Sequence, residues 1–589
     1  MTRVLKTQNM KQWLTQGWIS TYEGAPAYDY SDTHPLIHLV FTMGSALFTD
    51  GFYETEQAQV RTFAQSLLRA AQVDPKFPWQ YAAWMRDPKR GKGNRIQGSL
   101  APALLDALLP KDLRDEAIVA QYTALALSHR PDDVTACLTH YERLGLGRPS
   151  KAVRQGMALA LTKFDEYQLL KYTGSRQKVR LCDVILMVRE ELEALSDGGA
   201  LALAVGRYLH APTRSRKDHP SLDRMHLTRA RRALWAMPPS GALSPELPLQ
   251  LEASRVTWEQ VLSHFGAGND PSVKRRRKAV WSALLSVRGL VPDTALLRNV
   301  RNMVEAGVSA DQLTEVVSQR RFDKVWPHQV YAGYKAAPQL GAHFEAIFSR
   351  TLDRLPLGRH LGIADASGSM MVKVGGSKGS LNAMDVALCF TAIMSESSGL
   401  GASFSDGQFA QWSGGKCLSI AARGQHEGAL KFAQNPALRR GMGGTQVFGA
   451  VMELIKWLVD HPEVTPPDCL WFFSDMQFHP AAGALKSQPN VITELSKIHG
   501  VSLQGPPLEA ALKLYRKAIG PVDVVLWNLA AYAPVPVPAD MEGVLLVSGF
   551  DTNTFDTVSR WRQGLPMSGE GAPSVEESQE IVLDKIRAF

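Results

Sequence analysis

The spacing of apolar residues divides the chain into two parts. Residues 1–355 repeat apolar side chains at the three- and four-residue spacing of amphipathic helices and lack the alternation of strands. The best-patterned segments, in which we expect helices, are 60–72, 99–110, 116–129, 149–164 and 294–307. Short helices in series, none able to bury its apolar face alone, predict an α-solenoid-like stack. Because no clean sequence period is visible, a compact irregular helical domain remains the alternative.

The second part, residues 356–589, alternates short apolar strands with helices. The expected strands are 360–365, 401–406, 469–475, 523–529 and 543–549, and the expected helices are 382–396, 445–461 and 507–520. This alternation predicts a mainly parallel, doubly wound α/β sheet with helices on both faces. Binding sites in such sheets form at the carboxyl ends of the strands.

The first of these strands runs into a loop with the sequence Asp365-Ala366-Ser367-Gly368-Ser369. A carboxylate and two hydroxyls on alternate residues place three hard oxygen groups within reach of one point. Such groups suit Mg²⁺, Mn²⁺ or Ca²⁺ better than zinc or copper. The string alone is only moderately specific, because aspartate and serine are common in turns.

Two further loops add oxygen groups to this edge of the sheet. The glycine-rich loop 441–446 presents Thr445 at the start of a helix, and Asp475 ends the strand 469–475. Taken singly, Thr445 is explained equally well as a helix N-cap, and Asp475 as a turn residue. Asp406 ends the strand 401–406, and we expect it to be a plain strand-end residue, with support of the metal ligands from behind as the alternative.

The three loops together resemble the metal-ion-dependent adhesion site of von Willebrand factor A domains. The resemblance implies that a divalent metal ion, Mg²⁺ first and Mn²⁺ or Ca²⁺ as alternatives, is bound by Asp365, Ser367, Ser369, Thr445 and Asp475. It further implies that the hydroxyls bind the metal directly and that at least one aspartate acts through water. An open position would then remain for an acidic group of a partner.

The charge of the chain is unevenly divided. Residues 356–589 hold 18 Lys+Arg and 22 Asp+Glu, a net charge of −4. Subtracting these from the totals of 65 and 57 leaves 47 and 35 in residues 1–355, a net charge of +12. A basic first part beside a mildly acidic second part indicates a polyanionic partner for the first part only. A solvated basic surface is the alternative.

Basic residues of the first part gather in clusters at 86–95, 148–154, 171–180, 214–217, 229–232 and 274–278. Arginine offers a planar fork for phosphate oxygens, and Tyr167, Tyr172 and Trp281 lie close by in sequence, where aromatic rings can stack unpaired bases. For any single cluster, a solvated helix face is the alternative. The candidate RNA contacts are Lys89, Arg90, Lys92, Arg95, Arg148, Lys151, Arg154, Lys171, Arg176, Lys178, Arg180, Arg275 and Arg276.

One cluster has a spacing that places it on a helix. Arg148, Lys151 and Arg154 are three residues apart, so we expect them on one helix face, close to the helix start.

Segments 145–187 and 257–309 resemble the TROVE module of Ro autoantigen proteins. In the second segment, Trp258-Glu259 and the string PDTALLRNV at 292–300 are particularly specific, and 324–337 resembles the segment that closes the family's helical ring. The resemblance implies an all-α ring of HEAT-like helical hairpins over residues 1–355, followed by a von Willebrand factor A-like domain over 356–589. It also implies binding of Y-like noncoding RNA outside the ring and of single-stranded RNA ends in its cavity.

The sequence departs from the family in one loop. Many members carry a Trp-Ser-His sequence there for RNA contact, whereas this chain has TGSRQKVR at 173–180, without histidine. The resemblance therefore extends to a basic RNA-binding surface but not to base-specific contacts.

From these features we expect a cytoplasmic, monomeric RNA-binding protein that is not an enzyme. Five widely spaced cysteines indicate a reducing compartment, and no signal peptide or 20-residue apolar run is visible. No nucleophile–base pair or catalytic motif accompanies the oxygen-rich loops. The resemblance implies a role in RNA quality control or processing, as a scaffold for an exoribonuclease such as polynucleotide phosphorylase. The alternatives are a metal-dependent protein-interaction scaffold and an accessory subunit of an ATPase assembly.

Overall fold

The computed structural model of the protein describes most of the chain and forms two compact units. One unit comprises Arg61–Arg320 and Val582–Phe589, and the other comprises Met1–Val60 and Arg321–Ile581. The described residues are 18–20, 26–28, 34–43, 55–89, 91, 93–172, 179–212, 216, 219–268, 271–322, 325–350, 358–374, 381–406, 416–426, 428–439, 443–479, 497–498, 500, 506–529, 536–537, 541–548, 554–563 and 582–589.

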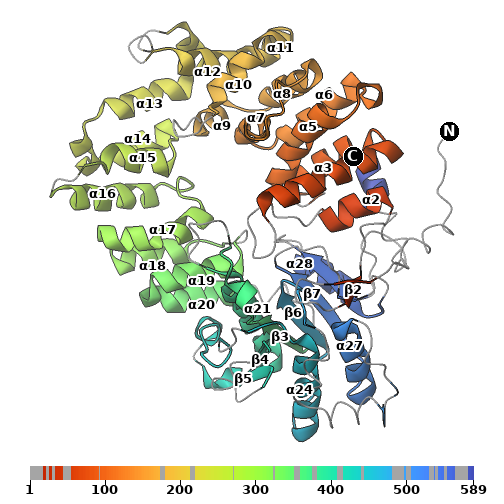
Figure 1. The fold of residues 1–589 in the computed structure, drawn as a ribbon. Helices are drawn as coiled ribbons and strands as arrows, with labels where there is room; N and C mark the ends of the chain where they lie inside the picture. The colour runs from red at the N-terminus through yellow and green to blue at the C-terminus, as the bar shows by residue number, and fades with distance from the viewer. Residues whose placement is uncertain are drawn as a thin grey trace. The chain divides into compact units, whose positions relative to one another are not determined.

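The first unit is built of helices that pack against their neighbours in the chain (Figure 1). Helix α4 packs on α5 and α6, α5 on α7, and α6 on α8, so each helix covers the apolar stripe of the next ones. The helices are α3 (Glu56–Val73), α4 (Phe77–Arg86), α5 (Arg95–Leu108), α6 (Glu116–Leu127), α7 (Pro131–Leu144), α8 (Lys151–Leu161), α9 (Glu166–Lys171), α10 (Leu181–Met187), α11 (Arg189–Glu193), α12 (Ala200–His210), α13 (His226–Ala236), α14 (Leu247–Ser254), α15 (Trp258–Phe265), α16 (Val273–Ser286), α17 (Asp293–Ala306) and α18 (Ala310–Ser318).

Local sequence signals set the ends of these helices. The Asp115 side chain accepts hydrogen bonds from two backbone N–H groups at the start of α6, and the Ser150 hydroxyl accepts one from the Val153 N–H at the start of α8. Helix α7 ends at Gly145, whose φ of 64° is the left-handed conformation that glycine adopts without strain. None of the described helices combines the length and apolar character that crossing a membrane requires.

The second unit is organised around a sheet whose described strands follow the order β5-β4-β3-β6-β7-β8. All neighbouring pairs are parallel except β4–β5, which is antiparallel. The sheet strands are β3 (His360–Asp365), β4 (Leu400–Phe404), β5 (Leu418–Ala422), β6 (Cys469–Ser474), β7 (Asp523–Asn528) and β8 (Val544–Ser548). The remaining elements are β1 (Trp18–Ser20), β2 (Pro26–Tyr28), α2 (Pro35–Ile37), α19 (Pro327–Ala336), α20 (Gly341–Ser349), α21 (Ala383–Ser398), α23 (Ala429–Phe432), α24 (Val447–Asp460), α27 (Pro507–Ala518) and α28 (Thr554–Arg562).

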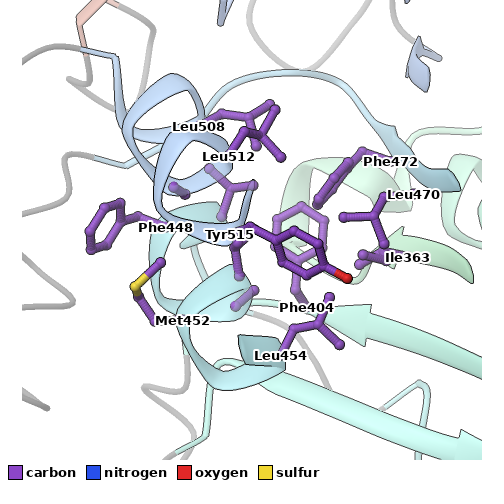
Figure 2. Close-up of a cluster of buried hydrophobic side chains, with 14 of the residues drawn as sticks. Ile363, Phe404, Phe448, Met452, Leu454, Leu470, Phe472, Leu508, Leu512 and Tyr515 are labelled. Atoms are coloured by element: carbon purple, nitrogen blue, oxygen red, sulfur yellow. The ribbon is translucent and has the colours of Figure 1, made fainter. Parts of the chain in front are cut away.

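Helices cover both faces of this sheet. On one face, α24 and α27 pack on alternate residues of the central strands, such as Ile363 of β3 and Phe472 of β6 (Figure 2). On the other face α21 packs closely on β3. The approach is so close that a Cβ added at Gly362 would lie 2.6 Å from the Thr391 Cα atom. The central strands β3 and β6 are therefore buried on both sides, as the centre of a doubly wound parallel sheet requires.

The predicted fold class is confirmed: a helical part is joined to a doubly wound α/β sheet. Each of the five expected strands and three expected helices of the second part is present within a few residues of its predicted bounds. The antiparallel edge strand β5 was not predicted. Its sequence, LSIAA, is half exposed and lacks both the continuous apolar run and the alternation that identify strands.

The compact units divide the chain near residue 320, whereas the sequence suggested a boundary at 355. Helices α19 and α20 belong to the sheet unit, because their side chains pack on or cap its helices. The Trp326 ring lies 6.2 Å from Phe390 of α21, and the Glu345 carboxylate accepts a 3.0 Å hydrogen bond from the Leu430 N–H of α23. The last eight residues belong to the helical unit, where Gln80 Nε2 donates to the Arg587 carbonyl at 2.6 Å.

Candidate metal site and candidate RNA contacts

The oxygen-rich loops meet at the carboxyl edge of the sheet. Strands β3 and β6 are parallel neighbours, so the residues that follow them leave the sheet side by side. The Ser474 hydroxyl, at the end of β6, donates to Asp365 Oδ2 at 2.5 Å. The third loop is attached by the Gly368 N–H, which donates to the Gly443 carbonyl at 3.0 Å. The structure thus joins all three predicted loops through hydrogen bonds.

The first loop turns back tightly on the end of β3. Asp365 Oδ1 accepts a 2.8 Å hydrogen bond from the Ser367 N–H, and the Ser367 and Ser369 hydroxyl oxygens lie 3.1 Å apart. All three side chains are buried, as are those of Thr445 and Asp475. Two hydroxyls and a carboxylate held this close in a buried loop form a hard-oxygen donor set of the kind that Mg²⁺ prefers.

Thr445 does not cap the helix that follows it. The N-cap position of α24 is occupied by Gln446, and Thr445 lies one residue earlier. Its side chain is fully buried, and its hydroxyl has no hydrogen-bond partner among the residues that the structure describes. Burying a hydroxyl without a partner costs about 1–3 kcal/mol. The alternative of an N-cap is therefore not seen, and the hydroxyl fits a ligand of a bound cation.

Asp406 and His479 hold the glycine loop in place. Asp406 Oδ2 accepts a 2.8 Å hydrogen bond from the Gly444 N–H, and the His479 N–H donates to the Thr445 carbonyl at 2.9 Å. Added Cβ atoms at Gly443 and Gly444 would lie 1.8 Å from Asp406 Oδ1 and His479 Nε2 respectively. A side chain at either position would force Asp406 or His479 to move, so the two glycines allow the loop to lie against these side chains.

Asp406 is therefore more than the plain strand-end residue that we expected. The available signal was that three strand segments, ending at Asp365, Asp406 and Asp475, all finish in an aspartate at the same edge of the sheet. The role of His479 had no comparable signal, because it depends on the close approach of a loop more than 30 residues away in sequence.

The residues present fit a divalent cation. Within the described part of the chain, no group of three or more His, Cys, Asp and Glu side chains converges, so a zinc-type site has no support there. The hydroxyls of Ser367, Ser369 and Thr445 would hold the ion, with Asp365 and Asp475 balancing its charge. A bound cation would supply a positive centre that can accept an acidic group of a partner.

Replacing Gly443 with alanine should damage both the loop and the cation site. The new Cβ would overlap Asp406, and we expect a loss of about 1–3 kcal/mol in the free energy of unfolding together with weaker Mg²⁺ binding. Denaturant titration and calorimetry measure the two effects. Gly424→Ala is the matched control, since a Cβ there meets no atom within 4 Å. Equal behaviour of the two variants would contradict the close packing of this loop.

Five of the predicted RNA contacts are exposed on the helical unit, and one of them, Arg180, is paired with Asp183. Lys89 follows α4, Arg148 precedes α8, Lys151 is the first residue of α8, and Arg275 lies in the first turn of α16. The predicted single helix face is only partly seen. Lys151 and Arg154 are on α8, but Arg148 lies in the preceding loop, because Ser150 is the N-cap and Pro149 disfavours helix at Arg148.

The other described candidates already interact within the protein. The Arg154 Nε donates to Glu191 Oε1 at 2.8 Å, Arg180 pairs with Asp183 at 2.6 Å, and Arg95 pairs with Asp132 and Asp133. The Lys171 ammonium lies over the rings of Tyr167 and Tyr172.

Arg276 is buried and donates to the Phe265 and Ala267 carbonyls, which identifies a structural role for this side chain. Four candidates, Arg90, Lys92, Arg176 and Lys178, lie outside the described residues.

The aromatic residues near the basic clusters are not equivalent. Trp281 is 2% exposed and stacks on Trp258 with ring centroids 5.8 Å apart, so it belongs to the core and does not offer a face to a base. Tyr167 and Tyr172 are half-buried and surrounded by cations, with the Arg255 guanidinium 4.6 Å from the ring centroid of Tyr167 and that of Arg130 5.0 Å from Tyr172.

This architecture is similar to that of known proteins. Residues 250–325, nearly all of them in the helical unit, match the TROVE domain. This match shows that the segment is similar to the TROVE domain family. The match includes the segment 257–309, whose resemblance was visible in the sequence.

The fold of the chain is similar to that of a particular solved structure, the crystal structure of the Ro (RSR) protein of Deinococcus radiodurans. The two sequences are 16% identical, the similarity covers 90% of this chain and 99% of that one, and the TM-score is 0.52. No curated protein sequence matches the chain.

Proposed function

We propose that this protein is a Ro-type RNA-binding protein. The observation that carries the proposal is the TROVE match at residues 250–325, which lie almost wholly in a helical unit that displays Lys89, Arg148, Lys151 and Arg275 at its surface. The net charge of +12 on residues 1–355, from 47 basic and 35 acidic residues, supports a polyanionic ligand for this part. The RNA that we propose is a structured, Y-like noncoding RNA with a single-stranded end.

The α/β unit, in this proposal, docks a protein partner. The buried Thr445 hydroxyl, without a partner among the described residues, and the close pair of Ser367 and Ser369 hydroxyls support a bound divalent cation, Mg²⁺ in the first place. The three hydroxyls are neutral, so an ion held there keeps positive charge for an acidic side chain of the partner. Asp406 and His479 orient the loop that carries Thr445 and need not touch the ion.

The biological role that we propose is RNA quality control or processing in the cytoplasm, with the protein acting as a monomeric scaffold. An exoribonuclease such as polynucleotide phosphorylase is the partner that this role calls for. We assign no catalytic step to the chain in this proposal. The second candidate function is that of a metal-dependent adhesion scaffold that binds no RNA. The buried Thr445 hydroxyl supports the metal binding that this function requires.

Protein purified at low salt from its own cells should carry RNA. Phosphate binding by a basic surface is strong at low ionic strength, so the absorbance ratio at 260 and 280 nm should be typical of a nucleoprotein. Ribonuclease should remove the excess absorbance and deoxyribonuclease should not. Protein free of nucleic acid, with a stoichiometric ATPase or another protein bound instead, would favour the alternatives.

A further inference from the structure

The helical unit contains a cavity that none of the predicted functions uses as a whole. Its volume is about 330 Å³, within the size range of small-molecule sites. It is formed by the start of α5, one face of α7 and Val179, which lies two residues before α10. The lining residues that matter are Arg95, Thr135, Thr139, His140, Arg143 and Val179.

One side of the cavity carries a fixed positive charge. The Arg95 Nε donates to Asp133 Oδ1 at 3.1 Å, and its Nη2 lies 2.8 Å from Asp132 Oδ2. These bonds hold the guanidinium still while 40% of the side chain stays exposed. Arg143 lines the same cavity and is exposed. A rigid arginine fork beside a second arginine suits the oxygens of a phosphate.

The other side of the cavity is uncharged. Burial, followed by the charges of Arg143 and Arg95, lowers the pKa of His140 to about 4, so its imidazole is neutral at pH 7. The Ser99 hydroxyl donates to the Arg95 carbonyl at 3.0 Å, and it therefore accepts the 3.1 Å hydrogen bond from His140 Nε2. With Val179 and the Ala136 methyl group, this fixed neutral ring forms a wall suited to a flat aromatic ring.

The charged side of the cavity continues into a cation–aromatic strip. Asp132, which binds Arg95, also accepts two 3.0 Å hydrogen bonds from Arg130. The Arg130 guanidinium lies 5.0 Å from the centroid of the Tyr172 ring, and the Lys171 ammonium lies 5.6 Å from the same centroid. Alternation of cations and aromatic rings is how proteins follow a single-stranded nucleic acid, with phosphates on the cations and bases on the rings.

We propose that this cavity takes one unpaired nucleotide of a bound RNA strand. The phosphate lies against Arg95 and Arg143, the base lies against His140, Ala136 and Val179, and the neighbouring nucleotide passes Arg130 and Tyr172. The inference rests on the proposed RNA-binding function. It adds that single-stranded RNA is bound at this cavity and that the cavity holds one nucleotide.

Two variants test the inference in the full-length protein. Ala136→Leu fills the cavity without changing the charge, and Arg143→Gln removes one cation. The probes are a fluorescent single-stranded RNA of about eight nucleotides, an RNA hairpin without a tail, and a free nucleoside monophosphate. We expect Ala136→Leu to weaken binding of the single strand about tenfold with an unchanged salt dependence, while hairpin binding stays the same. Arg143→Gln should weaken single-strand binding and also flatten its salt dependence.

The possible failures are distinguishable. If the unaltered protein binds neither RNA, the proposed function itself fails. If it binds both RNAs and Ala136→Leu changes neither affinity, RNA binding stands and the assignment of this cavity is overturned. The assignment of this cavity is also overturned if Ala136→Leu weakens binding of the hairpin and of the single strand equally. It is overturned as well if the free monophosphate binds the protein while Ala136→Leu leaves single-strand binding unaffected. Thermal melting of both variants shows that they fold.

Discussion

Replacing Asp365 with asparagine should abolish the gain in thermal stability that Mg²⁺ gives the unaltered protein. Asparagine keeps the shape of the side chain and can still accept the hydrogen bond from the Ser367 N–H, so the loop after β3 should stay folded. The charge that balances the cation is lost. A ligand present at 100 times its dissociation constant stabilises a protein by about 2.7 kcal/mol, and that amount should disappear.

The matched control for this change is Asp460→Asn. Asp460 lies on α24 in an exposed pair with Lys456 at 3.0 Å, and exposed pairs of this kind contribute only about 0.3–0.5 kcal/mol. Melting temperatures with Mg²⁺ and with chelator should differ for the control and coincide for Asp365→Asn. RNA affinity should be nearly the same in both variants. Loss of RNA binding along with Mg²⁺ binding would contradict the division of labour between the units.

Neutralising the four exposed cations should weaken RNA binding on the order of a hundredfold at low salt. The variant replaces Lys89, Arg148, Lys151 and Arg275 with glutamine. If each contacts a phosphate, the slope of log affinity against log salt should fall by about 3–4, since one contact contributes about 0.7–0.9. Exposed side chains contribute little to stability, so the melting temperature should change little. Fluorescence anisotropy over a salt series measures the slope.

Arg154 and Arg180 provide the comparison for this experiment. Both are predicted RNA contacts, but in the structure they pair with Glu191 and Asp183. Their replacement by glutamine should leave the salt slope nearly unchanged, and Arg154→Gln should lower stability because its ion pair is partly buried. A larger loss of RNA affinity from this pair than from the four exposed residues would mean that the RNA track has been placed wrongly.

The sequence was informative where a pattern repeats along an element. Strand β3 was predicted with its exact bounds because a continuous apolar run buried on both faces ends abruptly at Asp365. That the loops after β3 and β6 leave the sheet side by side followed from the rule that parallel strands end at one edge of the sheet. Strand β5 was missed because antiparallel pairing at a half-exposed edge leaves no such pattern.

Roles that depend on partners distant in sequence were out of reach. The six basic clusters could be counted from the sequence. The sequence did not reveal that Arg154 pairs with Glu191 or that Arg276 turns inward to the Phe265 carbonyl. For the same reason Asp406 looked like a strand end, although it binds the loop of Gly444 from 38 residues away. Charge and spacing therefore predict a binding surface better than they predict its individual contacts.

The most direct test of RNA binding is the affinity of the unaltered protein for a structured RNA with a single-stranded tail at two salt concentrations. A surface that neutralises 6–10 phosphates should lose about 10³–10⁵ in affinity between about 50 and 200 mM salt. We expect a loss of this order, with Mg²⁺ held constant so that the site at Asp365 does not contribute. Binding that is indifferent to salt, or no binding at either concentration, would contradict the proposal.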